Sequence, residues 1–226
     1  DKCSDKYTAC GCESGYKWEN GSCAQDRPSC NIGDIFYTDN TCVAAANHNS
    51  SKTVLGIVVH VNADGVGGQI MTPWPIDASG NKASSNSTTM QWSKEKVSIP
   101  NLSIYTTAAT ASKDYDSCGN TDKIVAVGNA STYPAAWATR KYAPTTETAG
   151  KWCLPAAGIM TNIYNNQTVI KNAISKASGV DIGNSPFTST ARDDTINIWV
   201  YVNGASYGLN NLGKGGSQPV RPVLEF

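Results

Sequence analysis

The cysteines limit most strongly what this chain can fold into. The sequence contains eight. Six lie in its first 42 residues, namely Cys3, Cys10, Cys12, Cys23, Cys30 and Cys42, and the other two are Cys118 and Cys153. A four-ligand zinc site usually shows two close Cys pairs or a Cys pair with a His pair, but His48 and His60 lie outside the cluster. We therefore favour disulfides over zinc for all eight cysteines and expect no metal site. Because disulfides persist in oxidising compartments, we expect the chain at a cell surface or in a secreted space.

The charge content excludes some partners. The formal net charge of the 226 residues is +0 and only 16% of them are charged, so no long-range field gathers nucleic acid or an anionic membrane. The longest apolar run, "TVLGIVVHV", has the length of a strand and is too short for a membrane span. We expect no nucleic-acid partner and no direct membrane insertion.

The first 29 residues differ in character from the rest. They contain little apolar material, so this segment cannot bury a core and must depend on its bridges. Its stretch "CGCESGYKWENGSC" resembles the last loop of an EGF-like module, which implies a Cys12–Cys23 bridge with Cys3–Cys10 beside it. We interpret residues 1–29 as an EGF-like spacer rather than a binding module, and residues 30–226 as the main domain.

Strand signals open the main domain. "IGDIFYTDNTC" predicts a strand, a turn at Thr38–Asn40 and a return strand, with Cys30 and Cys42 well placed to join the hairpin. "KTVLGIVVHVNADG" is a mostly apolar run that ends in an Asp-Gly turn, so it predicts a buried strand.

Two helices are expected further along. "STYPAAWATRKYA" carries a Ser or Thr cap with Pro134 near its first turn, and a longer helix starts at Pro155 and stops at Gly179. Asn165–Asn166 is a candidate break in the longer one. Cys118 and Cys153 could form a redox pair, but their wide separation favours a structural disulfide at the start of the long helix. Strands, then helices, then strands with long polar loops predict an α+β fold.

The sequence shows no catalytic motif. It lacks a G-x-S-x-G elbow, an H-E-x-x-H pair and a Walker A loop, and His60 sits in an apolar run typical of a satisfied core or edge histidine. Asp193 and Asp194 could bind calcium, but solvated loop carboxylates are more common. We expect no catalytic residue and no cofactor, and hence no enzyme.

Three segments carry a resemblance to a known family. "AGKWCLPAAGIMTNIYNNQTVI", the tail "VRPVLEF" and the opening "IGDIFYTDNTC" resemble motifs of bacterial domains with a C-type-lectin-like fold akin to that of the formylglycine-generating enzyme. The resemblance covers about residues 30–226. It implies two main helices with mixed or antiparallel sheets. Phe187 stands where the family usually has Trp, and Ile198 stands in place of an inward Trp.

The stretch "TINIWVYVNG" leaves two strand registers open. In the preferred one, alternate apolar residues from Ile196 to Val202 face the core, and Trp199 and Tyr201 face outward. The alternative turns Trp199 inward together with Asn203, and burying that amide without a partner is costly.

The resemblance also implies a function. Such family members are surface-exposed or phage-borne receptor-binding proteins, and some are variable proteins of diversity-generating retroelements. The composition of residues 190–218 fits such a variable segment, although an ordinary polar hairpin loop has the same composition. We expect a non-enzymatic protein that binds an unknown protein or glycan, because Tyr and Trp supply rigid contact area while Ser and Asn supply adaptable hydrogen bonds. The expected binding residues are Arg192, Asp193, Asp194, Asn197, Trp199, Tyr201, Asn203, Ser206, Tyr207, Asn210, Asn211, Lys214 and Ser217.

Two alternatives remain open at this point. A calcium-dependent sugar-binding lectin is the first, although the sequence lacks the Glu-Pro-Asn, Gln-Pro-Asp and Trp-Asn-Asp signatures of that group. An enzyme of the formylglycine-generating type is the second, and it would require a reactive pair of cysteines.

Overall fold

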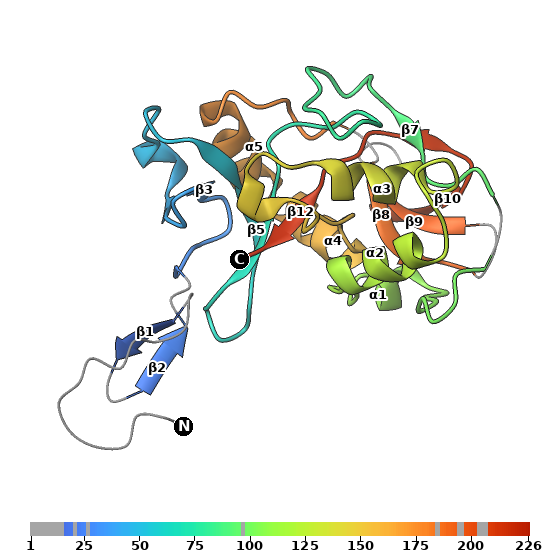
Figure 1. Ribbon diagram of the computed structural model, residues 1–226, viewed down its shortest axis with the longest axis horizontal. Coiled ribbons are helices and arrows are strands. Elements are labelled where there is room, and N and C mark those ends of the chain that lie inside the picture. Colours follow the sequence, from blue (N-terminus) through green and yellow to red (C-terminus); the bar gives the residue numbers. More distant parts are fainter. Residues whose placement is uncertain are drawn as a thin grey trace.

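The structure is a computed structural model of the chain. It describes the backbone of a hairpin, β1 (Tyr16–Glu19) with β2 (Ser22–Gln25), and residues 28–95, 98–183, 186–193, 197–202 and 208–226, with only the backbone at 201 and 202. The hairpin is antiparallel, with Trp18 opposite Cys23, and it lies to one side of the other elements (Figure 1). The expected Cys3–Cys10 and Cys12–Cys23 bridges involve residues outside these ranges.

A five-stranded antiparallel sheet forms one half of the main body. Its strand order is β12 (Val223–Glu225), β6 (Gly68–Met71), β5 (Val54–Val61), β3 (Ile35–Tyr37) and β4 (Cys42–Val43). The hairpin expected near Thr38–Asn40 is confirmed, with Asn40 in the left-handed region at φ 59° and a disulfide joining Cys30 to Cys42. The apolar run expected as a buried strand is β5, whose central residues are fully covered.

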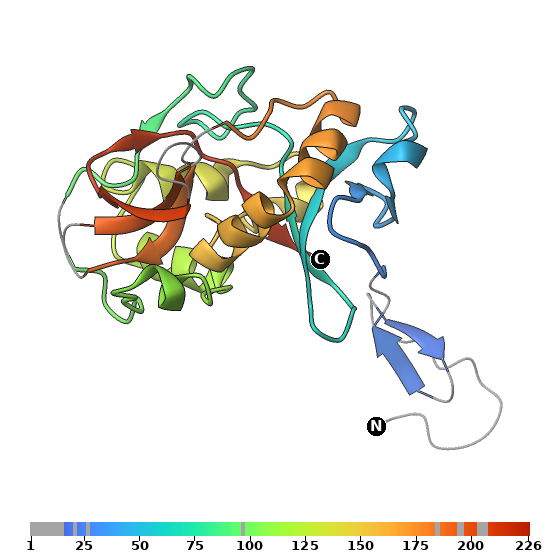
Figure 2. The same cartoon turned by 180° about the vertical axis from the view of Figure 1, so that it is seen from behind.

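The long expected helix is confirmed in two pieces. α4 (Ala157–Asn165) ends at the double Asn, and α5 (Gln167–Lys176) follows at once. Their isoleucines are buried, but Val169 is 47% exposed. Figure 2 shows the two helices from behind, where they run toward β5, and both of them contact this strand.

A three-stranded antiparallel sheet forms the other half of the body. Its strands are β8 (Phe187–Ala191), β9 (Asn197–Val202) and β10 (Gly208–Gly213), with β9 in the middle. A short pair, β7 (Met90–Gln91) with β11 (Ser217–Gln218), follows it, and α4 packs across β8 and β9. The described part of the chain is therefore α+β, as expected.

The expectation of two main helices, the long one and one around Pro134, is only partly met, because the structure also contains helices that were not expected. α3 (Pro134–Lys141) was expected, but α1 (Ala108–Ala111) and α2 (Ser117–Ala126) were not. The buried face of α2 is mostly polar, so it shows no apolar stripe, and its first turn is capped by the Asp116 carboxylate, which accepts from Gly119 N at 2.9 Å. Among the described residues, none of the helices has the length and apolar character needed to cross a membrane.

Buried hydroxyl groups hold the segment that leads into α4. The backbone N–H groups of Leu154, Ala156 and Ala157 donate to hydroxyl oxygens, respectively those of Thr121 at 3.0 Å, Ser117 at 2.9 Å and Thr190 at 2.8 Å. The Thr190 hydroxyl donates in turn to the Asp114 carboxylate at 2.6 Å. These bonds satisfy backbone donors that would otherwise be buried without partners. The entry of α4 is therefore fixed against both α2 and β8.

The Cys118–Cys153 disulfide fastens the same region. It joins α2 to the residue that pairs with Val223 of β12, so the predicted structural bridge at the start of the long helix is confirmed. Arg221, two residues before β12, is fully buried and donates to the backbone carbonyl oxygens of Pro73 at 3.0 Å and Val180 at 2.6 Å. Burial lowers the pKa of the Arg221 guanidinium to about 10. The tail is thus anchored from inside the body.

Candidate functional site

Strand β9 is covered on both of its faces. Ile198 and Val200 belong to the main core, while Trp199 on the opposite face is only 5% exposed and packs against Ala111 and Ala157. The expectation that Trp199 faces solvent is therefore wrong. Trp199 is buried because α1 and α4 together cover this face of the strand, and the sequence carried no signal for α1. Neither of the two registers considered for the stretch included a strand buried on both sides.

The indole of Trp199 is also fixed by polar contacts. Its Nε1–H donates to the backbone oxygen of Tyr105 at 2.7 Å, and the Arg192 guanidinium lies 5.9 Å from its ring centroid. Tyr105 is half-buried, and burial, with a smaller effect from the Asp114 carboxylate, raises the pKa of its phenol. Trp199 is thus a brace between β9 and the segment before α1, and it does not serve as an exposed anchor.

The connection from β8 to β9 brings three expected residues together. The two carboxylate oxygens of Asp193 accept from the backbone N–H of Asn197 at 2.9 Å and from its side-chain amide at 2.6 Å. The backbone N–H of Arg192 donates to the carbonyl oxygen of Asn197 at 3.1 Å. Asp193 and Asn197 therefore shape this end of the sheet through bonds to each other.

The expected residues on β10 and beyond it have different exposures. Asn211, opposite Trp199, is exposed, and Asn210, opposite Val200, is half-buried. Lys214 is 1% exposed, with its ammonium 5.5 Å from the ring centroid of Trp92, so the expectation that its side chain is an exposed binding residue is wrong. The turn after β10 folds this side chain inward. Ser217 is exposed in the separate β7–β11 pair.

The other expected residues are described less fully. Tyr201 lies in β9 with its backbone opposite Leu209, and nothing is described of its side chain. Asp194, Asn203, Ser206 and Tyr207 lie outside the described residues.

A shallow hollow of about 170 Å³ opens beside the start of β10. Ala108 and Ser112 line it from α1, Thr161 from α4, and Gly208 and Leu209 from the strand. The two hydroxyl groups donate to carbonyl oxygens of their own helices, which leaves their oxygen atoms able to accept from a ligand. Sequence reasoning missed the helical residues because the four residues of α1 show no periodic pattern.

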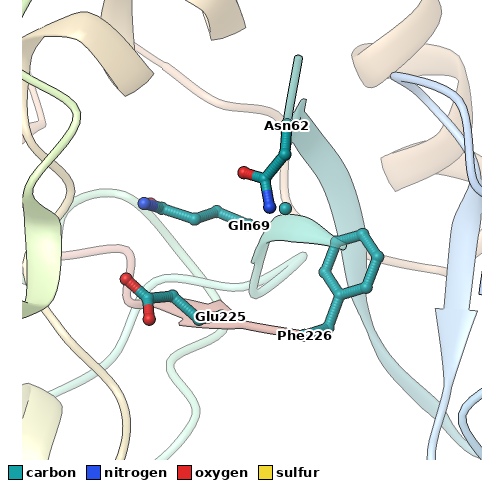
Figure 3. A pocket seen from close by; sticks show the side chains of 5 residues that line it. Asn62, Gln69, Glu225 and Phe226 are labelled. Atoms are coloured by element: carbon teal, nitrogen blue, oxygen red, sulfur yellow. The ribbon is translucent and has the colours of Figure 1, made fainter. Parts of the chain in front are cut away.

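A second hollow lies at the end of β12. Asn62, Gln69, Glu225 and Phe226 surround about 190 Å³, and the Gln69 and Glu225 side chains point to the same side (Figure 3). The Gln69 amide donates to Tyr115 O at 3.0 Å and accepts from the Ser117 hydroxyl at 2.8 Å, so its polar atoms are already engaged. The exposed Glu225 carboxylate is the group most available to a ligand here.

A wider groove of about 300 Å³ is also lined by Glu225, together with Leu224 of β12. It includes Lys151 and an ion pair in which Arg140 donates to Asp122 at 2.5 Å. Two acidic and two basic residues line this groove, so it has hydrogen-bonding capacity without a dominant sign of charge.

His60 and the cysteines also have partners. The His60 ring is half-buried, lies 3.1 Å through Nδ1 from the Asn162 amide nitrogen and stacks on Tyr115 with centroids 4.8 Å apart. The expectation of a satisfied histidine is confirmed, and burial lowers the pKa of this ring. Within residues 28–226, every described cysteine is in a disulfide.

Comparisons with known proteins show a likeness of fold to a solved structure. No family model matches the sequence, and no curated protein matches it. Among solved structures, the chain is similar to a crystal structure of a fimbrial protein from Bacteroides ovatus ATCC 8483, with a TM-score of 0.63 and 15% identity over 87% of this chain and 49% of that one. The chain thus spans about half the length of that structure, and the likeness is one of fold.

Proposed function

We propose that the chain is a non-enzymatic ligand-binding protein of a cell surface or secreted space, built as a C-type-lectin-like domain behind an EGF-like spacer. The two described disulfides support an oxidising location. The similar structure is titled a fimbrial protein, which supports a surface role by analogy of fold. The motifs "GKWCLPAAG" and "VRPVLEF" support the lectin-like assignment.

The proposed contact surface is the face of the three-stranded sheet that carries Trp199, together with the β10 edge, and we call it the distal surface. It comprises Arg192, Asn211, the hollow beside β10, and residues 203–207 of the β9–β10 connection. The observation that carries the proposal is the burial of β9 on both faces. A strand braced in this way holds its ends still, so a ligand meets contact residues that lose little freedom on binding.

The burial of Trp199 changes the proposed roles. Tyr201 and Tyr207 are now the proposed aromatic anchors, in place of Trp199. Asn203, Asn211 and the half-buried Asn210 supply adaptable hydrogen bonds. Trp199 stabilises the surface from below. In this account a diversified segment would vary the connection and the β10 side chains while the brace stays constant.

An exchange of the connection tests the proposal. Full-length chains with residues 203–207 replaced by Gly-Ser-Gly-Ser-Gly are compared with wild type on a glycan array and on a displayed library of random seven-residue peptides. We expect wild type to bind a defined subset and the exchanged chain to bind none of it. A matched control, Asn62→Ala with Glu225→Gln, alters the hollow at β12 and should bind as wild type does.

The same experiment separates the rival functions. Equal binding by the exchanged chain and wild type would remove the distal surface as the site. Repeating the glycan array with a chelator separates the calcium-dependent lectin, because only that alternative loses its glycan binding when calcium is withdrawn.

A further inference from the structure

The hydrogen bonds of β9 fix which backbone groups of β10 point outward. The carbonyl oxygen of Asn197 accepts from Arg192 N at 3.1 Å, and that of Trp199 accepts from the Thr188 hydroxyl at 2.6 Å, so both point toward β8. Successive residues of an antiparallel strand alternate in direction. Ile198 and Val200 therefore bond to β10, where their partners are Leu212 and Asn210.

It follows that the remaining residues of β10 point away from the sheet. These are Leu209, Asn211 and Gly213, and the carbonyl oxygen of Gly213 accepts from Gly216 N at 2.8 Å in the turn that follows, as this orientation requires. The backbone N–H and C=O groups of Leu209 and Asn211 meet no protein partner in the part of the chain that the structure describes.

The opposite edge of the same sheet is closed. Along β8, Ser189 N donates to Pro155 O at 2.8 Å, and Ala191 O accepts from Tyr105 N at 3.0 Å. The β8 edge is thus covered by two segments of the body, whereas β10 ends the sheet with a regular, bulge-free strand of six residues. An open edge of this kind is a template for another extended chain.

The hollow beside β10 indicates what the added chain would carry. It opens at Gly208 and Leu209, next to the outward-pointing groups, and its other walls include Ala108 and the side chain of Thr161. Gly208 has no heavy atom within 4 Å of the position where a Cβ would stand, so there is free space beside this residue on its side-chain face. A strand laid along the edge would place one side chain over the hollow, where apolar carbon is favoured.

We propose that the β10 edge binds an extended peptide segment of another polypeptide as a fourth strand, with one aliphatic side chain in the hollow. This inference rests on the proposed function and names its ligand class. A second copy of this chain fits less well. In the antiparallel register that pairs the outward-pointing groups of residues 209–213 with those of the copy, Gly213 of the copy lies beside Leu209 and leaves the hollow empty.

A backbone-directed substitution tests the inference. A peptide selected from the displayed library is synthesised, and its affinity is measured for full-length wild type, Asn211→Pro and Asn211→Ala. Proline removes the outward N–H and obstructs an added strand, yet it is tolerated on edge strands because that N–H has no partner among the described residues. Both variants lose the Asn211 side-chain amide, but only proline loses the backbone hydrogen bond, so we expect Asn211→Pro to bind on the order of tenfold more weakly than Asn211→Ala.

Three outcomes would overturn the inference: no library peptide binds wild type, Asn211→Pro binds as wild type does, or Asn211→Ala weakens binding as much as proline does. Glycan binding that depends on residues 203–207 would leave the proposed function standing in each case. If Asn211→Pro does not fold, amide hydrogen exchange on the wild-type chain provides a second test. Bound peptide should slow exchange at Leu209 and Asn211 on the order of tenfold, and unchanged exchange at both amides would refute edge pairing.

Discussion

The indole N–H of Trp199 donates to the backbone carbonyl oxygen of Tyr105 at 2.7 Å, which joins the middle strand of the small sheet to the segment before α1. A side chain that the sequence suggests as a contact residue is instead a structural brace. The distal surface therefore depends on it indirectly, through the position of β9.

Substitution of Trp199 should lower stability. Trp199→Ala removes a large buried ring and is expected to cost about 3–5 kcal/mol in the free energy of unfolding, whereas Trp199→Phe keeps most of the packing and costs about 1–3 kcal/mol through the unpaired carbonyl group. Urea denaturation measures both. An alanine variant as stable as wild type would show that the ring is exposed, and would restore it as a candidate anchor.

Arg221 anchors the tail through carbonyl groups. Arg221→Met leaves the oxygens of Pro73 and Val180 buried without their charged donor, so we expect a loss of roughly 2–4 kcal/mol. The control is Arg140→Met, which removes an ion pair with the mostly exposed Asp122 and should cost about 1 kcal/mol or less. Thermal and urea unfolding compare the two, and equal losses would contradict the anchoring role.

The two described disulfides should differ in their effect. Cys118–Cys153 spans 35 residues and Cys30–Cys42 spans 12, so the chain-entropy model gives about 4 and about 3 kcal/mol respectively. Removing each pair as a double Cys→Ala variant, followed by urea denaturation, measures the difference. The account expects the larger loss for Cys118–Cys153, which also fastens the entry to α4; the reverse order would argue against that role.

A thiol assay bears on the enzyme alternative. Because the four cysteines between residues 28 and 226 are in disulfides, none of them should react with a thiol reagent before unfolding. The assay is run on the native chain and again after denaturation with a reductant, which sets the full signal. A native signal that maps by peptide mass to Cys118 or Cys153 would revive chemistry of the formylglycine-generating type.

The half-buried His60 predicts a pH dependence. Burial holds the pKa of its ring below the unfolded value of 6.5, so the unfolded chain binds the proton more readily. Its contribution to stability is complete above about pH 6.5 and is lost as the pH falls below that value. Urea unfolding at pH 7.5 and pH 5 should show a smaller loss for His60→Gln than for wild type. An identical loss in both chains would contradict the role of this ring.

Local signals were enough to predict much of the fold. The Thr38–Asn40 turn between apolar strands, the apolar run of β5 and the double Asn between α4 and α5 each determine structure within a few residues. Both described disulfides followed from the position of their cysteines beside these elements.

Other features depend on contacts between distant segments. α2 buries Ser117, Asn120 and Thr121, and these polar residues give no apolar period. Ser117 and Thr121 accept from backbone N–H groups more than 30 residues away, and Asn120 donates to the Asp114 carboxylate. The orientation of Trp199 depends on α1, a helix of four residues. The alternation of apolar residues correctly gave Ile198 and Val200 as core, but it could not reveal that the opposite face was covered as well.

The location of the bound ligand tests the central claim most directly. Backbone amide chemical shifts of the full chain are followed by NMR while a ligand identified on the glycan array or in the peptide library is added. The account predicts that the largest changes fall at Arg192, Asp193 and Gly208–Asn211, with little change at Asn62, Gln69 and Glu225. Changes concentrated around Glu225, with the β10 amides unmoved, would contradict it and move the binding site to the hollow at β12.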